Sequence, residues 1–540
     1  MLRRRGRPDQ GKAVGDRRLL RHDDRPDRRN ALDHRLCRQA VLVGRPGGTP
    51  GRPPGPGRCP AARGELRKVP LRLRHALSEE ACGEALHLDQ RRQRRPAAGA
   101  DDRPCPVGGL GPGTRTGGAL GRDGRNRPES AGPRLPGHID GEGRPAVNGA
   151  LSALAPHSSK RISEYAQRHP ETIDLTVGLP SFGPPRSFGE RLAVLSGSPG
   201  ESARPEDHYA HSRGTIELRT AIAQVYRSEQ GIDLDPDTQL LVTNGAAGAL
   251  WTAVLTVTDP GDEVLLADPA YMIYPPMIEL LGRRVVRVPT SAADGFTLHV
   301  PDLRKHLTKR SRIVLVNSPG NPTGRVTGGS ELADLCTFAA DHGLYVIHDE
   351  VLDRFAYGIE HRSVAALDHH GHGITVNSLS KRFGMSGWRI GWMTGSPAVI
   401  TEAAKAHTFF MLAVSHAVQL AAAAALRDPE ADGELTVHAA KTRRHGERFL
   451  ADVAQLPGLA RTEFPDGGFY AFVDVGEFAR LRGIHVEDST GSAVAEYLLH
   501  ECGVAVVPGS AFGRAGERFI RMSFAGDPGQ LDRALERLTG

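Results

Sequence analysis

The chain has 540 residues, enough for more than one domain, and a formal net charge of +6. Residues 1–150 hold 30 Arg and 2 Lys against 17 acidic residues, a net charge of +15, so residues 151–540 carry −9. The sequence has no run of about 18 apolar residues, no secretory signal after its first Met, and six cysteines without a C-x-x-C pair. We therefore expect a cytoplasmic protein without a membrane span, a disulfide framework or a zinc site.

Residues 1–146 differ in composition from the rest of the chain. They contain no Phe, Tyr or Trp and a single Ile, Ile139, which is too little apolar surface to offset the chain entropy lost on folding. Three interpretations are a disordered basic tail, a nucleic-acid-binding arm, or upstream G+C-rich DNA translated from too early a start. We favour the third, which predicts a native protein whose mass corresponds to a start near Val147; a start at Met1 would refute it.

Beyond residue 150, apolar runs typical of buried strands alternate with helical periodicity. We expect strands at 239–243, 263–267, 284–288, 313–317, 345–348 and 374–377, and helices at 246–257, 331–342 and 414–426. This alternation predicts an α/β fold with a largely parallel, buried sheet. Short strands and helices after residue 426 indicate a smaller α+β domain.

The segment Ser378–Arg389, with the sequence SLSKRFGMSGWR, carries the most chemistry. A lysine at the end of a buried strand, Lys381, loses solvation, which lowers its pKa and frees the amine for Schiff-base chemistry. Arg389 can return to the same place and bind a phosphate with its planar guanidinium. Ser378-x-x-Lys381 also matches the serine acylases, but their S-D-N and K-T-G partners do not occur. A surface lysine is the plain alternative for Lys381.

Other polar residues follow the expected strands. The turn Asn317–Gly324 would direct the Asn321 amide beyond the carboxyl edge of the sheet. Asp349 ends an apolar run, and a buried carboxylate there needs a cationic or protonated partner, such as a pyridinium nitrogen. Tyr271 follows a further strand, where packing is its plain alternative role.

Two more segments indicate anion binding. Small residues, including Ala246 and Ala247, begin the helix after the strand at 239–243, so their backbone amides can approach a phosphate. Arg521 lies in the apolar, strand-like run Phe519–Phe524, where it needs a carboxylate partner. The α-carboxylate of an amino acid would be such a partner.

Taken together and in this order, these motifs resemble the class I and II aminotransferases of fold type I, which depend on pyridoxal 5'-phosphate, over roughly residues 151–540. The resemblance implies that Lys381 binds the cofactor as a Schiff base and moves the substrate proton. It implies that Asp349 keeps the ring nitrogen protonated, Asn321 holds the ring oxygen, and Tyr271 stacks on the ring. The phosphate would be bound by Ser378, Arg389 and the amides of Ala246 and Ala247.

The resemblance also implies an oligomer and a reaction. Tyr209 matches the tyrosine that reaches the phosphate of a neighbouring subunit, which implies a homodimer, and Gly178 and Arg521 match the contacts of the substrate carboxylate. The reaction would exchange an amino group between an L-amino acid and a 2-oxo acid, with no part for nucleic acid or membrane. The domains would be residues 201–425, which bind the cofactor, and a smaller domain made of 147–200 and 426–540.

Two positions depart from the family pattern. Leu352 stands where the family usually has a tyrosine that donates to the ring oxygen, and Ala247 stands where some bacterial aspartate aminotransferases carry a lysine. The first departure leaves open a lyase or oxidase on the same scaffold. A regulator that joins a DNA-binding arm to an aminotransferase-like sensor is the alternative of another class, although residues 1–146 show no periodic apolar face. We expect no metal site, since His369, His370 and His372 lie in a Gly-rich connection.

Overall fold

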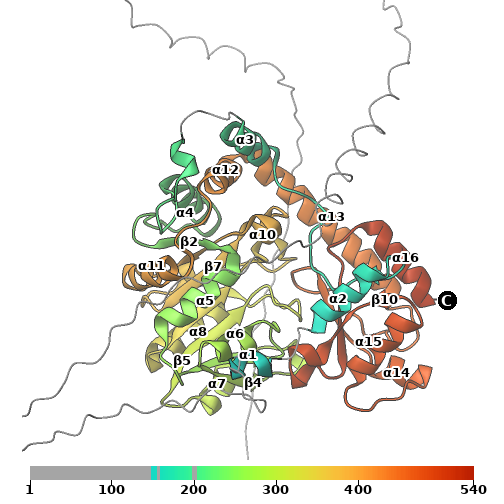
Figure 1. The fold of residues 1–540 in the computed structure, drawn as a ribbon. Helices are drawn as coiled ribbons and strands as arrows, with labels where there is room; N and C mark the ends of the chain where they lie inside the picture. Colours follow the sequence, from blue (N-terminus) through green and yellow to red (C-terminus); the bar gives the residue numbers. More distant parts are fainter. Residues whose placement is uncertain (1–147, 155–157, 198–202, 540) are drawn as a thin grey trace, which may run out of the picture. The chain divides into compact units, whose positions relative to one another are not determined.

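The computed structural model describes residues 148–154, 158–197 and 203–539 (Figure 1). All of them belong to one compact unit, Arg127–Gly540. The basic extension expected at residues 1–146 lies outside the described residues. In the part of the chain that is described, no helix is both long and apolar enough to cross a bilayer.

A seven-stranded sheet organises the larger part of this unit, in the order β2-β8-β7-β6-β5-β3-β4. β8 runs antiparallel to both of its neighbours, and the other pairs are parallel. The strands are β2 (Leu240–Asn244), β3 (Glu263–Asp268), β4 (Arg284–Pro289), β5 (Ser311–Asn317), β6 (Tyr345–Asp349), β7 (Gly373–Ser378) and β8 (Ile390–Thr394).

Helices cover both faces of this sheet because its strands are apolar on both sides. In β5, Ile313 and Leu315 pack with α5, α6 and α11, whereas Val314 and Val316 pack on the opposite face with α7 and α8. These helices are α5 (Gly245–Val257), α6 (Tyr274–Leu280), α7 (Val300–His306), α8 (Gly329–His342) and α11 (Pro397–Met411). α4 (Ile216–Gln230) and α12 (His416–Arg427) pack against β2 and β8.

Two small sheets lie outside the large one. β9 (Tyr470–Asp474), β12 (Phe519–Ser523) and β11 (Val507–Pro508) are antiparallel, and β1 (Ile173–Asp174) pairs in parallel with β10 (Val504–Ala505). Their core includes residues of α13 (Pro429–Val453), α14 (Gly476–Arg482), α15 (Thr490–His500) and α16 (Pro528–Thr539). The remaining helices are α1 (Gly149–Ala153), α2 (Ser158–Arg168), α3 (Arg186–Ser196), α9 (Val364–Leu367) and α10 (Leu379–Arg382).

The predicted α/β architecture is confirmed, and every strand expected between residues 239 and 377 is present. The helix expected at 414–426 begins two residues later, at His416, after Ser415. Of the seven strands in the large sheet, β8 is the one that reverses direction, because a tight connection through α10 and the turn at 386–388 links it to its neighbour β7.

Candidate active site

The site residues gather where the parallel strands end. β2, β3, β5, β6 and β7 run in the same direction, so their carboxyl ends share one edge of the sheet. In parallel sheets this edge is where ligands bind. Asp349 is the last residue of β6, and the segments that follow β2, β3, β5 and β7 carry Ala246, Tyr271, Asn321 and Lys381, respectively.

Lys381 lies in the one-turn helix α10, directly after β7. Its Nζ donates a hydrogen bond to the carbonyl oxygen of Gly178 at 2.7 Å. Burial, together with the smaller effect of the charges of Arg521 and Arg389, lowers the pKa of Lys381 to about 8. A lysine with this pKa has a substantial neutral fraction near pH 8, so it can act as a nucleophile or a base.

An anion cradle is built where the turn after α10 meets the start of α5. Arg389 has a left-handed backbone conformation (φ 56°), and its Nη2 donates to the carbonyl oxygen of Asn244 at 3.3 Å. A Cβ on Gly245 would lie 2.5 Å from that nitrogen, and one on Gly391 would lie 2.6 Å from the amide nitrogen of Ala246. Both glycines are therefore needed for this close approach, which places a guanidinium beside the free amides of a helix N-terminus.

Ser378 and Ala247 complete the residues predicted to bind phosphate. The Ser378 side chain is buried and caps α10, accepting a hydrogen bond from the amide of Ser380 at 3.3 Å. Ala247 lies in the first turn of α5 and is exposed. A hydroxyl, a guanidinium and helix amides are the donors that a phosphate monoester requires.

Asp349 is buried at the end of β6. Its Oδ2 accepts a hydrogen bond from the hydroxyl of Tyr274 at 2.6 Å. Burial raises the pKa of Asp349 to about 6, although the bonds from Tyr274 and the amide of Val351 oppose this shift. The carboxylate is thus poised to accept a protonated nitrogen as a further partner.

Arg521 occupies β12 and faces residues from several elements. Its Nη1 donates to Oδ1 of Asn321 at 2.9 Å, and its Nη2 donates to the carbonyl oxygen of Thr176. The guanidinium lies over the rings of Tyr470, at 4.3 Å, and Phe512, at 5.1 Å. Its Nε is buried and has no partner among the described residues. Burial lowers the pKa of Arg521, and the nearby Tyr470, Tyr271 and Asp174 oppose this shift. A bound carboxylate would compensate the buried charge further.

Gly178 brings the segment before α3 into the site. A Cβ at this position would lie 1.8 Å from the hydroxyl oxygen of Tyr470, so no other residue fits without a shift of the backbone or the ring. The segment that holds the Gly178 carbonyl against Lys381 also holds Thr176 against Arg521. The nucleophile and the guanidinium therefore share one wall.

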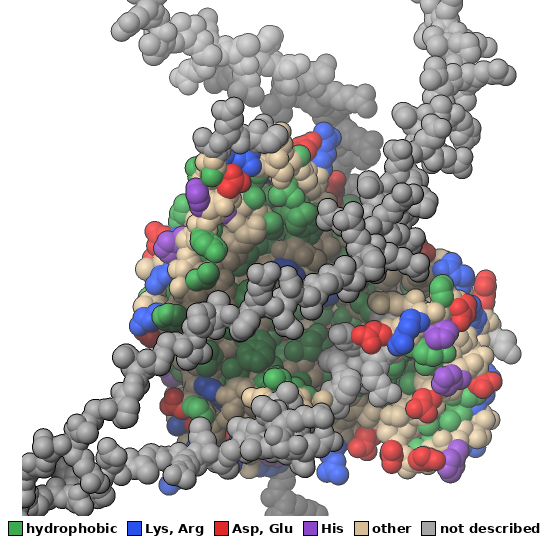
Figure 2. All heavy atoms as spheres, viewed as in Figure 1, with side chains coloured by type: hydrophobic (Ala, Val, Ile, Leu, Met, Phe, Trp, Pro, Cys, Tyr) green, Lys and Arg blue, Asp and Glu red, His purple; other side chains and the backbone are tan. Residues whose placement is uncertain are grey.

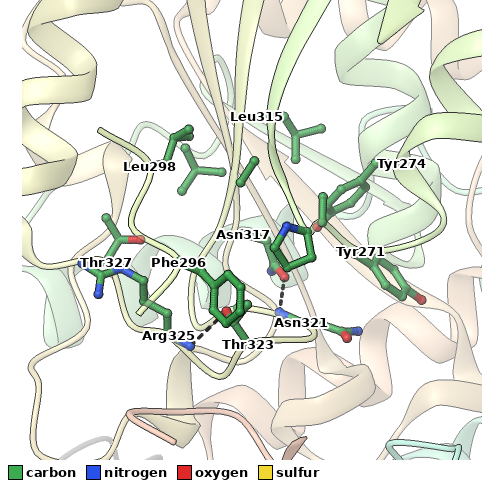
Figure 3. A pocket seen from close by; sticks show the side chains of 15 residues that line it. Tyr271, Tyr274, Phe296, Leu298, Leu315, Asn317, Asn321, Thr323, Arg325 and Thr327 are labelled. Carbon is green, nitrogen blue, oxygen red and sulfur yellow. Dashed lines mark hydrogen bonds between the residues drawn. The ribbon is translucent and has the colours of Figure 1, made fainter. Parts of the chain in front are cut away.

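Tyr271 lines an open cavity of about 550 Å³ at the ends of β3 and β5 (Figure 3). The cavity is also lined by Tyr274, Phe296, Asn321 and Arg325. A dashed line in Figure 3 joins Asn317 to Asn321, where Oδ1 of Asn317 accepts from the amide of Asn321 at 2.7 Å. Lys381, Asp349 and Arg521 do not line this cavity, which therefore lies beside the group that they form. Tyr271 and Asn321, which do line it, offer an aromatic face and an amide of the kind that suit a flat ring with polar substituents.

Two predicted features stand apart from this group. The side chain of Tyr209, on the loop before α4, is 83% exposed, and within the described residues no hydrogen bond joins it to the site. Leu352 is buried in a core that includes Phe469 and Tyr470. A Cβ on Gly468 would lie 3.4 Å from Cδ1 of Leu352 and 4.0 Å from the carbonyl oxygen of Gly320. Gly468 is therefore close to both Leu352 and the turn that carries Asn321, and Leu352 offers no hydroxyl there.

Sequence reasoning missed Tyr274, Tyr470, Thr176 and Phe512. Tyr274 follows Tyr271 by three residues, which is the spacing that places two side chains on one side of a helical turn and was the available signal. The other three contact Arg521 from distant segments, and local spacing carries no signal for such contacts.

The donor set fits a flat, phosphorylated aldehyde. A buried amine, a phosphate cradle, an aromatic wall and a buried carboxylate lie at one sheet edge, with an incompletely paired arginine nearby. No group of three or more His, Cys, Asp or Glu side chains suited to a metal is found in the described part of the chain.

Comparisons with known proteins agree with this geometry. The family model "Aminotransferase class I and II" matches residues 170–538. The chain is 33% identical to the aspartate aminotransferase of Pyrococcus abyssi over 397 residues, covering 73% of this chain and 97% of the relative. It is likewise 33% identical to the aspartate/prephenate aminotransferase of Thermus thermophilus, over 393 residues, 72% of this chain and 96% of the relative.

Solved structures show the same relationship. An aromatic aminotransferase from Pyrococcus horikoshii aligns with a TM-score of 0.62 and 34% identity, covering 70% of this chain and 97% of that one. The Thermus thermophilus aspartate aminotransferase with maleate aligns with a TM-score of 0.65 and 31% identity, covering 73% and 98%. This chain belongs to the class I and II aminotransferases.

Proposed function

We propose that this aminotransferase works with pyridoxal 5'-phosphate bound at the carboxyl edge of the large sheet and held covalently by Lys381. The observation that carries the proposal is the buried Lys381 amine, with a pKa of about 8, beside the Gly178 carbonyl. When bound, the cofactor withdraws electrons from the substrate Cα and so weakens its bond to hydrogen. The amino group passes between an L-amino acid and a 2-oxo acid.

Each predicted residue has a role in this proposal. Ser378, Arg389 and the amides of Ala246 and Ala247 bind the phosphate, as supported by the free helix N-terminus beside the Arg389 guanidinium. Tyr271 would pack on the ring, and the side-chain amide of Asn321 would donate to the ring oxygen, while Oδ1 of Asn321 accepts from Arg521. Asp349 keeps the ring nitrogen protonated, and Tyr274 orients that carboxylate.

The substrate is held by its α-carboxylate. The Arg521 guanidinium receives it, which would supply a partner for the unpaired Nε of this buried charge. The Gly178 segment borders the same guanidinium through the Thr176 carbonyl. The Nζ of Lys381 would remove the proton from Cα of the amino acid, and in the reverse reaction it would deliver a proton to Cα of the oxo acid's carbon skeleton. Because Arg521 contacts the group that all amino acids share, it fixes orientation rather than side-chain preference.

A homodimer in the cytoplasm, with shared active sites, completes the proposal. The end of α11 exposes Phe409, Phe410 and Leu412, and Tyr209 is exposed as well. Figure 2 shows hydrophobic side chains gathered on the visible face that carries α5 and α11. A second copy would cover these side chains and bring Tyr209 to the partner's phosphate. We also propose that 147–200 and 426–540 form one domain beside 201–425, as supported by the pairing of β1 with β10.

The test is spectroscopic. Purified protein incubated with a panel of amino acids should convert the bound cofactor to pyridoxamine phosphate with the true donors, and added 2-oxo acid should reverse the change. Release of ammonia, or consumption of oxygen without reversal, would instead identify the lyase or the oxidase.

The pH dependence of cofactor capture follows from the Lys381 amine. Only the neutral amine attacks an aldehyde, so the capture rate of the cofactor-free chain should rise about tenfold per pH unit below pH 8 and level off above it. Stopped-flow absorbance measures this rate. In the control, the rate at which free Nα-acetyl-lysine reacts with the aldehyde should continue to rise up to about pH 10.4. A protein curve that levels off only at that higher pH would contradict the assignment.

Leu352→Tyr tests the missing donor to the ring oxygen. A hydroxyl beside the Asn321 turn should stabilise the oxygen anion by about 1.5–3 kcal/mol and lower the pKa of the bound chromophore by roughly 1–2 units. An absorbance titration measures it. Leu352→Phe has nearly the same size without the hydroxyl, so its titration should match the wild type. Equal shifts in both variants would attribute the effect to packing rather than to the donor.

A further inference from the structure

A buried cluster of charges lies directly beside the Lys381 segment and has no part in the function described so far. Glu229 on α4, Asp353 in the turn after β6 and Arg382 on α10 are joined by hydrogen bonds. The cluster borders a small, partly open pocket, which is also lined by Tyr226, Gln230, Glu350, His361, Asn377 and Trp392.

Arg382 is the centre of this cluster. Its Nη1 and Nη2 donate to the two carboxylate oxygens of Glu229 at 2.8 and 2.7 Å, and Nη2 also donates to Oδ2 of Asp353 at 2.7 Å. The Arg382 side chain is 2% exposed. A two-pronged, buried contact of this kind fixes direction as well as distance.

Arg382 immediately follows Lys381 in a helix of one turn. Successive side chains on a helix diverge by about 100° around its axis, so Lys381 faces Gly178 while Arg382 faces Glu229. So short a helix has little stability of its own. Leu379 packs in the core, but apolar contacts are not directional. The rotation of this turn, and with it the direction of the Lys381 amine, is therefore set mainly by the Arg382 fork.

The same cluster reaches the strand that carries Asp349. Nδ2 of Asn377, at the end of β7, donates to Oδ2 of Asp353 at 2.9 Å and lies 3.5 Å from Oε1 of Glu350. Glu350 directly follows Asp349 and accepts from the hydroxyl of Tyr226 at 2.6 Å. One hydrogen-bonded unit thus links the segment of the amine to the segment of the carboxylate.

The charges in the cluster depend on Arg382. Burial alone would raise the pKa of Asp353, but Arg382 and His361 hold it below its usual value. Burial would lower the pKa of His361, and Glu350 instead raises it. Without the Arg382 fork, the buried Asp353 would lose its cationic partner and the partly exposed Glu229 would keep only Arg354, so this turn would have to rearrange.

We propose that Arg382 is a positioning residue, which holds the Lys381 amine in its buried place at a fixed distance from Asp349 through its fork on Glu229 and Asp353. The inference rests on the proposed function in that Lys381 is the amine that binds the cofactor. It assigns to the cluster a role in catalysis beyond stabilising the fold.

Arg382→Lys tests the inference, because it keeps the charge and removes the fork. Competitive labelling of the full-length, cofactor-free chain with acetic anhydride, read by mass spectrometry over a range of pH, gives the pKa of Lys381 itself. A turn released from its anchor exposes the amine, so this pKa should rise by about one unit or more toward 10.4. In the loaded enzyme, kcat should fall by about tenfold or more, while KM changes by less than about threefold.

Arg354→Lys is the matched control. Arg354 also donates to Oε1 of Glu229, at 2.9 Å, but it lies in the turn after β6 and not on α10. The Arg354→Lys variant should leave the pKa of Lys381 unchanged. An equal shift in Arg354→Lys, or a folded Arg382→Lys with the wild-type pKa and kcat, would overturn the proposal.

A second variant covers a failure to fold. If Arg382→Lys does not give a cooperative thermal transition, Asp353→Asn keeps the shape of the partner and weakens one side of the fork. It should shift the Lys381 pKa in the same direction, and an unchanged pKa would overturn the proposal. Lys381→Ala tests the proposed function separately from the role of Arg382. If the cofactor still binds covalently to this variant, the assignment of Lys381 is wrong, independently of the result for Arg382.

Discussion

Lys381→Ala should abolish covalent attachment of the cofactor and lower kcat by about 10⁴-fold, the upper end of the contribution of general acid–base catalysis. The variant removes the nucleophile that captures the aldehyde and the base that moves the Cα proton. Among the described residues, the Gly178 carbonyl accepts a hydrogen bond only from Lys381. No second amine at this position can therefore replace Lys381. Borohydride reduction followed by intact-mass measurement reports the attachment, and steady-state kinetics report kcat.

Lys405→Ala is the control for this substitution. Lys405 is 61% exposed on α11 and pairs with Glu402, so its loss should leave both the borohydride-trapped mass and kcat at wild-type values. A trapped adduct of undiminished yield in Lys381→Ala would assign the chemistry to a different lysine.

The large sheet was predictable because its strands are short apolar runs bounded by helices. The strand expected at 263–267 spans Glu263–Asp268, and the helix expected at 331–342 spans Gly329–His342. The two-residue strands β1 and β10 were not predictable, since two residues show no periodicity, and their pairing joins residues 173 and 504. Strand order likewise depends on packing between distant segments.

The site divides in the same way. Lys381, Asp349, Asn321 and Arg389 lie in short motifs at or near the ends of strands, so residue type and local position were enough to select them. The contacts that tune those residues are remote in the chain: the partner of Lys381 is 203 residues away, and the Thr176 carbonyl is 345 residues from Arg521. The anchoring of Arg382 by Glu229, 153 residues away, is of the same kind. No spacing rule reaches such contacts.

Arg521→Lys should reduce kcat/KM by about 10²–10³-fold for every amino acid alike, mainly through a higher KM. Removing one partner of a buried ion pair costs about 3–5 kcal/mol, and lysine recovers part of this because it keeps the charge but loses the two-pronged contact. The Nε of Arg521, which is buried and has no partner among the described residues, indicates that a ligand carboxylate belongs here. Initial rates over a range of substrate concentrations give kcat and KM separately.

The discriminating measurement compares each amino acid with the amine that lacks only its carboxylate. In the wild type, kcat/KM should be much higher for the amino acid than for the amine. In Arg521→Lys this ratio should fall by the same 10²–10³-fold, because the amine has no carboxylate for the guanidinium to bind and its own kcat/KM should not change. Arg518→Lys is the control, since Arg518 precedes the same strand, is 60% exposed and pairs with Asp474 at 2.8 Å. A preference for the carboxylate that survives in Arg521→Lys would place the carboxylate on another cation and leave the buried Arg521 as a structural charge.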